Sequence, residues 1–129
     1  MYHPEDPNAS KYKGKHAITP LFGVKVPMIA DELVEREKGT GLVMCCTFGD
    51  DTDKEWWRKY KLPTRAILGK DGKIDVTEVI KVKSDSNHDS HVNHLITSLN
   101  GLKPKQANAK IIELLQADGK LLKQTPMTH

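Results

Sequence analysis

Short apolar runs separated by turn residues fill the first half of the chain, a pattern typical of β-structure. Residues 2–15 are polar and rich in Pro, Asn and Lys, which predicts a loop. Two apolar runs, 17–21 and 24–30, flank Phe22-Gly23 and predict a hairpin. Because Pro27 cannot donate a ladder hydrogen bond, we expect the second strand to lie at an edge or to carry a bulge.

Residues 42–48 form a continuous apolar run of strand length, which predicts a buried central strand. The acidic stretch 31–38 before it predicts a turn or one helical turn. After it, residues 52–60 predict a short helix, with acids in the first turn and bases in the last. Leu62-Pro63 should end this helix.

The second half of the chain predicts a hairpin followed mostly by helix. Asp71-Gly72 lies between the apolar runs 65–68 and 74–76, a strong hairpin signal. The most regular helical pattern covers 104–117, where Pro104 stands in the first turn and Asp118-Gly119 follows the last. The remaining predicted elements are a loop at 83–89, a short helix at 91–99 and a last strand at 121–124.

The length of 129 residues suits one domain, so we expect residues 1–129 to form a single domain. The apolar fraction of 37% allows a core that is not large. Both ends look cut rather than evolved, and we therefore interpret the chain as a fragment of a longer protein. The net charge of +3 fits contact with RNA phosphate, and it fits many proteins that bind no RNA.

Cysteine usage and hydropathy indicate where the protein acts. Cys45 and Cys46 are adjacent in an apolar run, and neighbours on a strand point to opposite faces, so no disulfide is expected between them. This favours a reducing, cytoplasmic compartment. Residues 1–6 lack the apolar segment of a signal peptide, and no stretch is long enough to span a membrane.

Acidic residues crowd the start of the helix predicted at 52–60, namely Asp50, Asp51, Asp53 and Glu55. Acids at this place accept orphan backbone N–H bonds and oppose the positive helix end, so helix capping alone explains them. However, they follow a Gly39-Thr40-Gly41 turn and an apolar run. That layout aims carboxylates at the mouth of a strand-to-helix junction, where a cationic or hydroxyl-bearing ligand could sit.

The spacing of these residues resembles the editing domains of class I aminoacyl-tRNA synthetases for valine, isoleucine and leucine. In that family a Gly-Thr-Gly turn leads into a strand, and a helix-opening Asp follows at a fixed distance; Gly39-Thr40-Gly41 and Asp53 keep that distance. The Asp50-x-x-Asp53 pair resembles the valyl form. Other segments that resemble the family are His3-Pro4-Glu5-Asp6-Pro7, Pro20-Leu21-Phe22, Val26-Pro27-Met28-Ile29, Asp31-Glu32 and Leu99-Asn100-Gly101-Leu102. Cys46-Thr47-Phe48-Gly49-Asp50, with Glu55-Trp56-Trp57 and Tyr60, resembles the archaeal-type branch of the valyl enzymes.

The resemblance implies a mixed β and α fold, in which helices flank a compact, barrel-like sheet. It implies that the chain is the C-terminal portion of such a domain, without the family's threonine-rich segment that forms the other wall of the pocket. We therefore expect the isolated fragment to be inactive or weakly active. The implied function, as part of a synthetase, is hydrolysis of threonyl esters on valine tRNA after transfer. The implied partners are the acceptor end of that tRNA, the threonyl ester and the rest of the synthetase in cis.

Proofreading is needed because an apolar pocket cannot strongly reject an isostere that only adds a hydroxyl, a limit for which the valyl enzymes are themselves the standard example. By resemblance, Asp53 would bind the α-ammonium of the threonyl group, and Asp50 would accept the threonine hydroxyl or support Asp53. The other candidate substrate-binding residues are Met44, Cys46, Thr47, Phe48 and Gly49. Bacterial valyl enzymes carry Lys, Thr and His where Met44, Cys46 and Gly49 stand. The resemblance implies no metal or cofactor in this fragment, while the full-length enzyme uses ATP.

Several alternatives stay open. The chain could be an isoleucyl- or leucyl-type editing domain, although Asp50-x-x-Asp53 and Trp56-Trp57 argue against this. It could instead be a non-catalytic RNA- or protein-binding module. One Trp is expected in the core and the other to be partly exposed, where it could stack on an unpaired tRNA end. His88, His91 and His94 recur every three residues and could bind a metal, but a solvated polar stretch is the favoured interpretation.

Overall fold

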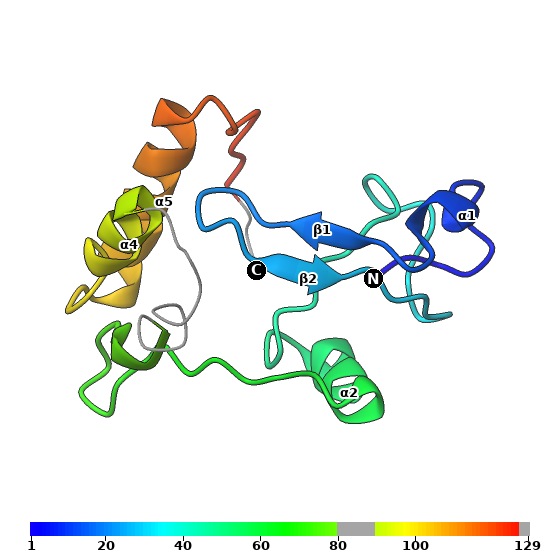
Figure 1. Cartoon of the computed structure of the whole chain (residues 1–129), viewed down its shortest axis with the longest axis horizontal. Coiled ribbons are helices and arrows are strands. Elements are labelled where there is room, and N and C mark those ends of the chain that lie inside the picture. The colour runs from blue at the N-terminus through cyan, green and yellow to red at the C-terminus, as the bar shows by residue number, and fades with distance from the viewer. Residues whose placement is uncertain (80–89, 127–129) are drawn as a thin grey trace. The chain divides into compact units, whose positions relative to one another are not determined.

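The structure is a computed structural model that describes residues 1–79 and 90–126. The elements in chain order are α1 (Ala9–Tyr12), β1 (His16–Ile18), β2 (Lys25–Pro27), α2 (Asp51–Tyr60), α4 (Ser90–Thr97) and α5 (Pro104–Ala117) (Figure 1). The chain divides into two compact units. The first unit comprises Met1–Ile18 and Lys25–Thr64, and the second comprises residues 19–24 and the chain from Arg65 onward. The mixed α and β composition is confirmed. The described residues form no closed barrel, so the barrel-like sheet stays a prediction, as does the single domain.

The predicted hairpin near the N-terminus is confirmed, with shorter strands than expected. β1 and β2 pair in antiparallel fashion, with Ala17 opposite Val26. The connection is closed at Thr19, which exchanges backbone hydrogen bonds with Val24 and Gly23 and accepts the Val24 N–H on its hydroxyl oxygen at 3.0 Å. Pro27 ends the ladder, and β2 pairs on one side only among the described residues. The edge position predicted from Pro27 is therefore observed.

The N-terminal segment is held in the first unit by Tyr2, which is buried. Tyr2 bridges Ala30 on one side and Leu42 on the other. Its N–H donates to Ile29 at 3.0 Å, and its carbonyl accepts from the Asp31 N–H at 2.9 Å. The ring of Tyr2 meets Tyr12 of α1 edge-on, with the ring centroids 5.4 Å apart. The polar N-terminal segment, which we predicted to be a loop, thus contains a short helix and anchors two other segments.

The prediction of a buried central strand at 42–48 is wrong. Only Leu42 in this run makes a bridge, and the burial of the side chains alternates along it. Met44 and Phe48 are 60% and 55% exposed, whereas Val43 is half-buried. A continuous apolar run does not reveal whether one or both faces are covered, and here only one face is.

Helix α2 begins and ends where local signals predict. Asp50 caps its N-terminus, and Lys61 closes its C-terminus in a left-handed conformation with φ of 49°. Trp56 is only 3% exposed and belongs to the core of the first unit, while Trp57 is half-buried. This confirms that one tryptophan packs inside and the other is partly exposed.

A buried carboxylate attaches the C-terminal half of α2 to the segment that follows β2. The side chain of Asp31 is 1% exposed, and its Oδ2 accepts from Lys59 Nζ at 2.7 Å and from the Tyr60 hydroxyl at 2.6 Å. Its Oδ1 accepts from the Leu33 N–H at 2.9 Å. Burial raises the pKa of Asp31, but the hydrogen bonds from Lys59, Tyr60 and Leu33 outweigh burial and hold this pKa well below its ordinary value.

The lowered pKa of Asp31 predicts a loss of stability in acid. A carboxyl group whose pKa falls on folding stabilises the native state above its unfolded pKa of about 3.9, and this contribution disappears as the pH falls toward the lower folded value. We expect wild-type protein to protect α2 from hydrogen exchange better than Asp31→Asn at pH 7, and this advantage to shrink at pH 3. An equal advantage at both pH values, after correction for intrinsic exchange, would show that the Asp31 charge contributes nothing.

The second unit confirms its predicted hairpin and helices. Leu68 bridges Ile74, and Gly69 N–H donates to the Lys73 carbonyl at 2.8 Å around the Asp71-Gly72 turn. Its helices are α4 and α5, and its buried apolar residues are Val76, Leu95, Ile96, Leu99 and Ala107. The described residues 121–126 contain no strand, so the predicted last strand is wrong, and the loop predicted at 83–89 lies outside the described residues. No helix in the described ranges is long and apolar enough to cross a membrane.

Candidate functional site at the start of helix α2

The acids at the start of α2 occupy three different environments. Asp50 is exposed and acts as the N-cap, with its Oδ1 accepting the Asp53 N–H at 2.8 Å. Asp51 points into solvent and pairs with Lys54 at 2.6 Å. Asp53 is 8% exposed, and no described residue forms an ion pair with it. Helix capping therefore accounts for an acid at Asp50, and exposure to solvent makes an acid at Asp51 inexpensive. Neither accounts for a buried acid at Asp53.

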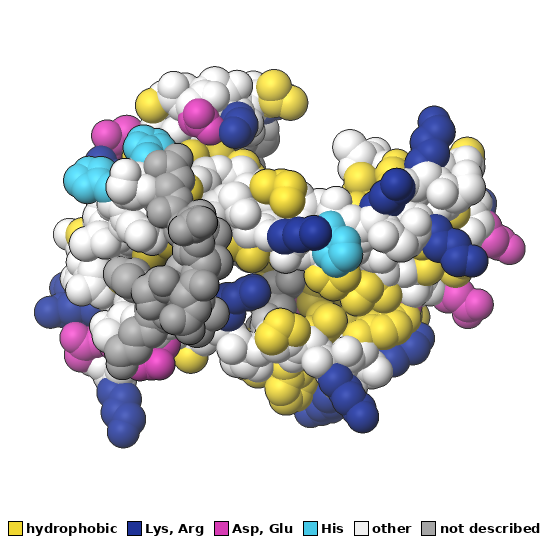
Figure 2. Space-filling model, in the orientation of Figure 1, with side chains coloured by type: hydrophobic (Ala, Val, Ile, Leu, Met, Phe, Trp, Pro, Cys, Tyr) yellow, Lys and Arg dark blue, Asp and Glu magenta, His cyan; other side chains and the backbone are white. Residues whose placement is uncertain are grey.

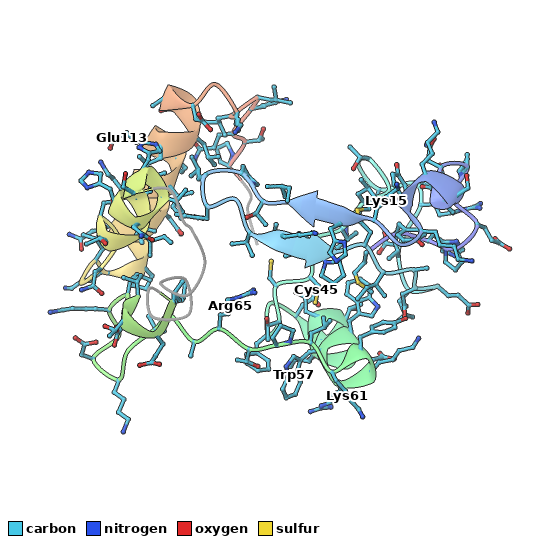
Figure 3. The ribbon with its side chains drawn as sticks, viewed as in Figure 1. Lys15, Cys45, Trp57, Lys61, Arg65 and Glu113 are labelled. Atoms are coloured by element: carbon cyan, nitrogen blue, oxygen red, sulfur yellow. The ribbon has the colours of Figure 1, made fainter. Side chains whose placement is uncertain are left out.

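The Asp53 carboxylate faces the segment that leads into α2. Its Oδ2 fills the space beside Gly49 in which a side chain would begin, and a β-carbon at Gly49 would also lie 3.5 Å from the Cys46 Cβ. Cys45 approaches the backbone carbonyl of Asp53, with its Sγ 3.8 Å from that oxygen. Cys45 lies on the chain entering α2, and Trp57 projects from the helix itself (Figure 3). The buried carboxylate thus lies against a glycine and two cysteines.

Both cysteine thiols beside the acids have a raised pKa. Burial raises the pKa of Cys46, and the carboxylates of Asp53 and Asp50 raise it further. Burial also raises the pKa of Cys45, to which Asp53 contributes in the same direction while a backbone hydrogen bond from Thr47 opposes it. Both thiols therefore remain protonated near neutral pH. A site with an unpaired carboxylate and neutral neighbours favours a cationic ligand over an anionic one.

An aromatic pair borders the acids. The backbone reverses at Thr47, which has φ of 57°, and the Phe48 N–H donates to the Cys46 carbonyl at 2.7 Å. This reversal brings Phe48 edge-on to Trp57, with the ring centroids 5.1 Å apart. The Trp57 indole N–H donates to the Thr64 hydroxyl at 3.1 Å. A largely exposed aromatic ring is thus fixed beside the start of α2.

The structure brings together four of the residues that we predicted for the site: Asp50, Asp53, Cys46 and Gly49. Thr47 shapes the backbone, and Phe48 joins the site through Trp57. Met44 is exposed and makes no hydrogen bond to Asp53 in the part of the chain that the structure describes. Sequence reasoning missed the support of α2 by Asp31. The available signal was an acid directly after a predicted strand, where a buried charge requires a partner.

Two of the three histidines of the histidine-rich stretch lie among the described residues. His91 and His94 lie on α4 and are exposed, and His88 lies outside the described residues. Within residues 1–79 and 90–126, no three His, Cys, Asp or Glu side chains are placed to hold a metal ion together. The metal alternative therefore has no geometric support in the described residues.

Variants of Asp50 test how much its cap stabilises α2. We expect Asp50→Ala to destabilise α2 by about 1 kcal/mol, because the Asp53 N–H loses its acceptor. Asp50→Asn should retain the cap, since an amide oxygen also accepts this bond. Hydrogen exchange of the first turn of α2 measures both effects. Equal protection in Asp50→Ala and wild type would show that the cap does not stabilise the helix.

Comparison with known proteins identifies the family of the chain. A family model described as the leucyl-tRNA synthetase editing domain matches residues 5–116. The chain therefore belongs to the editing-domain family of aminoacyl-tRNA synthetases.

Within that family the chain is similar to valine–tRNA ligases. It is 46% identical to those of Rickettsia felis and Rickettsia rickettsii over all 129 of its residues, and 42% identical to that of Rickettsia prowazekii over 124 residues, 96% of the chain. The chain spans 13–14% of the length of these relatives. It is thus an editing-domain segment of valyl type, as the spacing of its glycines and acids indicates. Its assignment to the archaeal-type branch stays a prediction.

Proposed function

We propose that this segment takes part in post-transfer editing by a full-length valyl-tRNA synthetase, which would hydrolyse threonine from valine tRNA. The observation that carries this proposal is the buried Asp53 carboxylate, which has no ion-pair partner among the described residues. A buried carboxylate without an ion-pair partner is costly, and a cationic ligand would stabilise it. The α-ammonium of an aminoacyl ester is such a cation, and it would bind through charge-assisted hydrogen bonds.

The reaction needs little more from this segment than orientation of the ester. A water oxygen attacks the ester carbonyl carbon, the bond from that carbon to the ribose oxygen breaks, and the ribose oxygen takes up a proton. Held by Asp53, the ammonium fixes the carbonyl in place, and the neighbouring ribose hydroxyl assists the water. No side-chain base is then required. Positioning of this kind can supply a large part of a hydrolytic rate enhancement.

Selectivity for threonine over valine would come from polar groups that bind the threonine hydroxyl. Valine would leave such groups unpaired, and an unpaired buried polar group costs about 1–3 kcal/mol. Asp50 Oδ1 already accepts the Asp53 N–H as the cap of α2. We therefore propose that Asp50 supports Asp53 and does not bind the threonine hydroxyl. We assign the surrounding contacts to Met44, Cys46, Thr47, Phe48 and Gly49.

The partners proposed here are the acceptor end of valine tRNA and the rest of the synthetase. The exposed ring of Phe48, braced by Trp57, offers a face on which an unpaired base can stack. Hydrophobic side chains gather on the surface of the first unit near β2 and α2 (Figure 2). We propose that other parts of the synthetase cover this surface and complete a barrel-like sheet there. We expect the segment itself to need no cofactor, with ATP used for aminoacylation elsewhere in a cytoplasmic enzyme.

The test is deacylation by the full-length synthetase that contains this segment. Preformed threonyl-tRNA(Val) and valyl-tRNA(Val) are supplied separately, and ester loss is followed in each. We expect the threonyl ester to be hydrolysed on the order of 10- to 100-fold faster, in line with the cost of an unpaired polar group. A non-catalytic binding module would leave both esters at their uncatalysed rates.

A further inference from the structure

The first unit carries a group of lysines without acidic neighbours in sequence, from α1 to β2. Residues 8–30 contain no aspartate or glutamate. They contain four lysines, which we call the lysine strip: Lys11, Lys13, Lys15 and Lys25. All four are exposed, and none forms an ion pair with a described residue. Elsewhere in the same unit, Arg36, Lys54 and Lys59 each pair with an acid.

Backbone pairing holds the members of the lysine strip near one another. Ile18 of β1 lies opposite Lys25 of β2, and both side chains are exposed. The pairing extends to Lys15, whose carbonyl accepts the Met28 N–H at 3.0 Å. The other two lysines lie in α1 and directly after it. Figure 3 shows Lys15 where the chain enters β1, and Figure 2 shows basic side chains over the hairpin and toward α1.

The charges of the lysine strip favour an extended polyanion as ligand. Cations without counter-ions in the protein repel one another, and a partner with several negative charges relieves this repulsion. Contact between lysines and successive phosphates also releases the cations condensed on a nucleic acid. Ile18 is 64% exposed beside this strip and offers an apolar contact that a base or ribose can use and an inorganic anion cannot. The surface therefore fits a nucleic-acid strand.

The candidate ester site in the same unit has the opposite charge. Asp53 is buried without an ion-pair partner among the described residues, and the exposed Asp50 accepts its N–H. These carboxylates repel a phosphate. The end of an aminoacyl-tRNA has the complementary order of charges, because a run of phosphates leads to a single ammonium. A strip of lysines together with an acidic ester site matches both parts of that ligand.

Paired segments of the first unit connect the two surfaces. The chain leaves β2 toward Ala30, and Tyr2 bridges Ala30 on one side and Leu42 on the other. Leu42 begins the run that leads to the cap of α2 at Asp50. The lysine strip and the ester site thus belong to one framework of backbone hydrogen bonds.

We propose that the lysine strip binds phosphates of the tRNA acceptor end and thereby guides the terminal ester to Asp53. This inference rests on the proposed editing function and adds a second contact surface for the same tRNA, separate from the ester site. Phosphate contacts position a nucleic acid and carry no sequence information. The strip therefore contributes to binding of the misacylated tRNA and takes no part in the hydrolytic step.

The first part of the test measures deacylation of threonyl-tRNA(Val) by the full-length synthetase carrying both Lys15→Gln and Lys25→Gln. We expect KM to rise on the order of 10-fold at constant kcat. The plot of log(kcat/KM) against log[salt] should become less steep by about 0.7 for each lysine removed. The control carries Lys110→Gln and Lys120→Gln, which remove the same charge from lysines that already form ion pairs. It should keep the wild-type KM and salt dependence.

The second part locates the contact without requiring hydrolysis. Wild-type synthetase is acetylated with and without a threonyl-tRNA(Val) in which an amide replaces the ester, and mass spectrometry gives the extent of acetylation at each lysine. With this RNA at about ten times its Kd, acetylation of Lys15 and Lys25 should slow on the order of 10-fold, because only unbound protein reacts there. Lys110 and Lys120 should react equally in both samples.

The outcomes separate the inference from the function on which it rests. A raised KM in the strip variant alone, together with protection of Lys15 and Lys25 by the RNA, supports the inference. An equal KM in the strip variant and its control overturns it, as does equal acetylation with and without the RNA; equally slow acetylation would show that protein covers the strip. A wild-type enzyme that fails to deacylate threonyl-tRNA(Val) removes the proposed function, while the acetylation experiment still shows whether the strip binds RNA.

Discussion

Asp53→Ala in the full-length synthetase is expected to abolish deacylation of threonyl-tRNA(Val) while valine aminoacylation continues. Truncating one member of a buried charge pair costs about 2–5 kcal/mol, so kcat/KM should fall on the order of 100-fold or more. Threonyl-tRNA(Val) should then accumulate when the variant is supplied with threonine and ATP. Its level over time, compared with that for the wild-type enzyme, is the measurement.

The same variant tests the purely structural explanation of the acids. Asp50, and not Asp53, supplies the side-chain cap of α2, so alanine at residue 53 leaves the cap in place. Removing a first-turn acid weakens the interaction with the helix dipole by about 0.3–1 kcal/mol, and the higher helix propensity of alanine partly offsets this loss. We therefore expect little loss of helix stability and a large loss of editing. If Asp53→Ala instead lowered the melting temperature and left deacylation intact, the acids would be helix caps only.

Asp31→Ala is expected to have the largest effect on the stability of the first unit. The variant removes the acceptor for Lys59, Tyr60 and Leu33, and leaves the Tyr60 hydroxyl with the Ala30 carbonyl alone. Losing hydrogen bonds to a buried charged group costs about 2–3 kcal/mol, which corresponds to amide exchange about 30- to 150-fold faster in α2. Hydrogen exchange of the α2 peptides in the full-length protein measures this.

Two further variants show whether the effect arises from the Asp31 network. Tyr60→Phe removes one donor and should produce part of the loss. Asp51→Asn breaks an ion pair on the solvated face of the same helix and should leave exchange unchanged, because exposed pairs contribute little. Equal exchange in Asp31→Ala and Asp51→Asn would show that Asp31 does not hold α2.

Elements with local signals could be predicted from the sequence. Helix α5 has the bounds expected from Pro104 at its start and Asp118-Gly119 after its end. The start of α2 was marked by its acids and its end by Leu62-Pro63. Such signals depend on backbone hydrogen bonds at helix ends, which neighbouring residues satisfy whatever the rest of the fold does.

Features that depend on distant contacts could not be predicted. Asp31 and Lys59 are 28 residues apart in sequence, and no local pattern joins them. The apolar composition of the run 42–48 predicts a buried strand, but burial depends on which segments cover each face. Likewise, the sequence predicts that Asp50 and Asp53 lie at one helix start and that Gly49 belongs to the site. The close approach of the Asp53 carboxylate to Gly49 is visible only in the structure.

The central claim, that Asp53 binds the ammonium of the misacylated ester, is tested most directly by removing the charge from each side in turn. Wild-type enzyme and Asp53→Asn are compared on threonyl-tRNA(Val) and on the same tRNA esterified with the 2-hydroxy acid that lacks the ammonium. We predict that the substitution slows hydrolysis of the threonyl ester on the order of 100-fold and leaves hydrolysis of the hydroxy ester almost unchanged, because the coupling exists only when both charges are present. An equal loss on both esters would contradict the account.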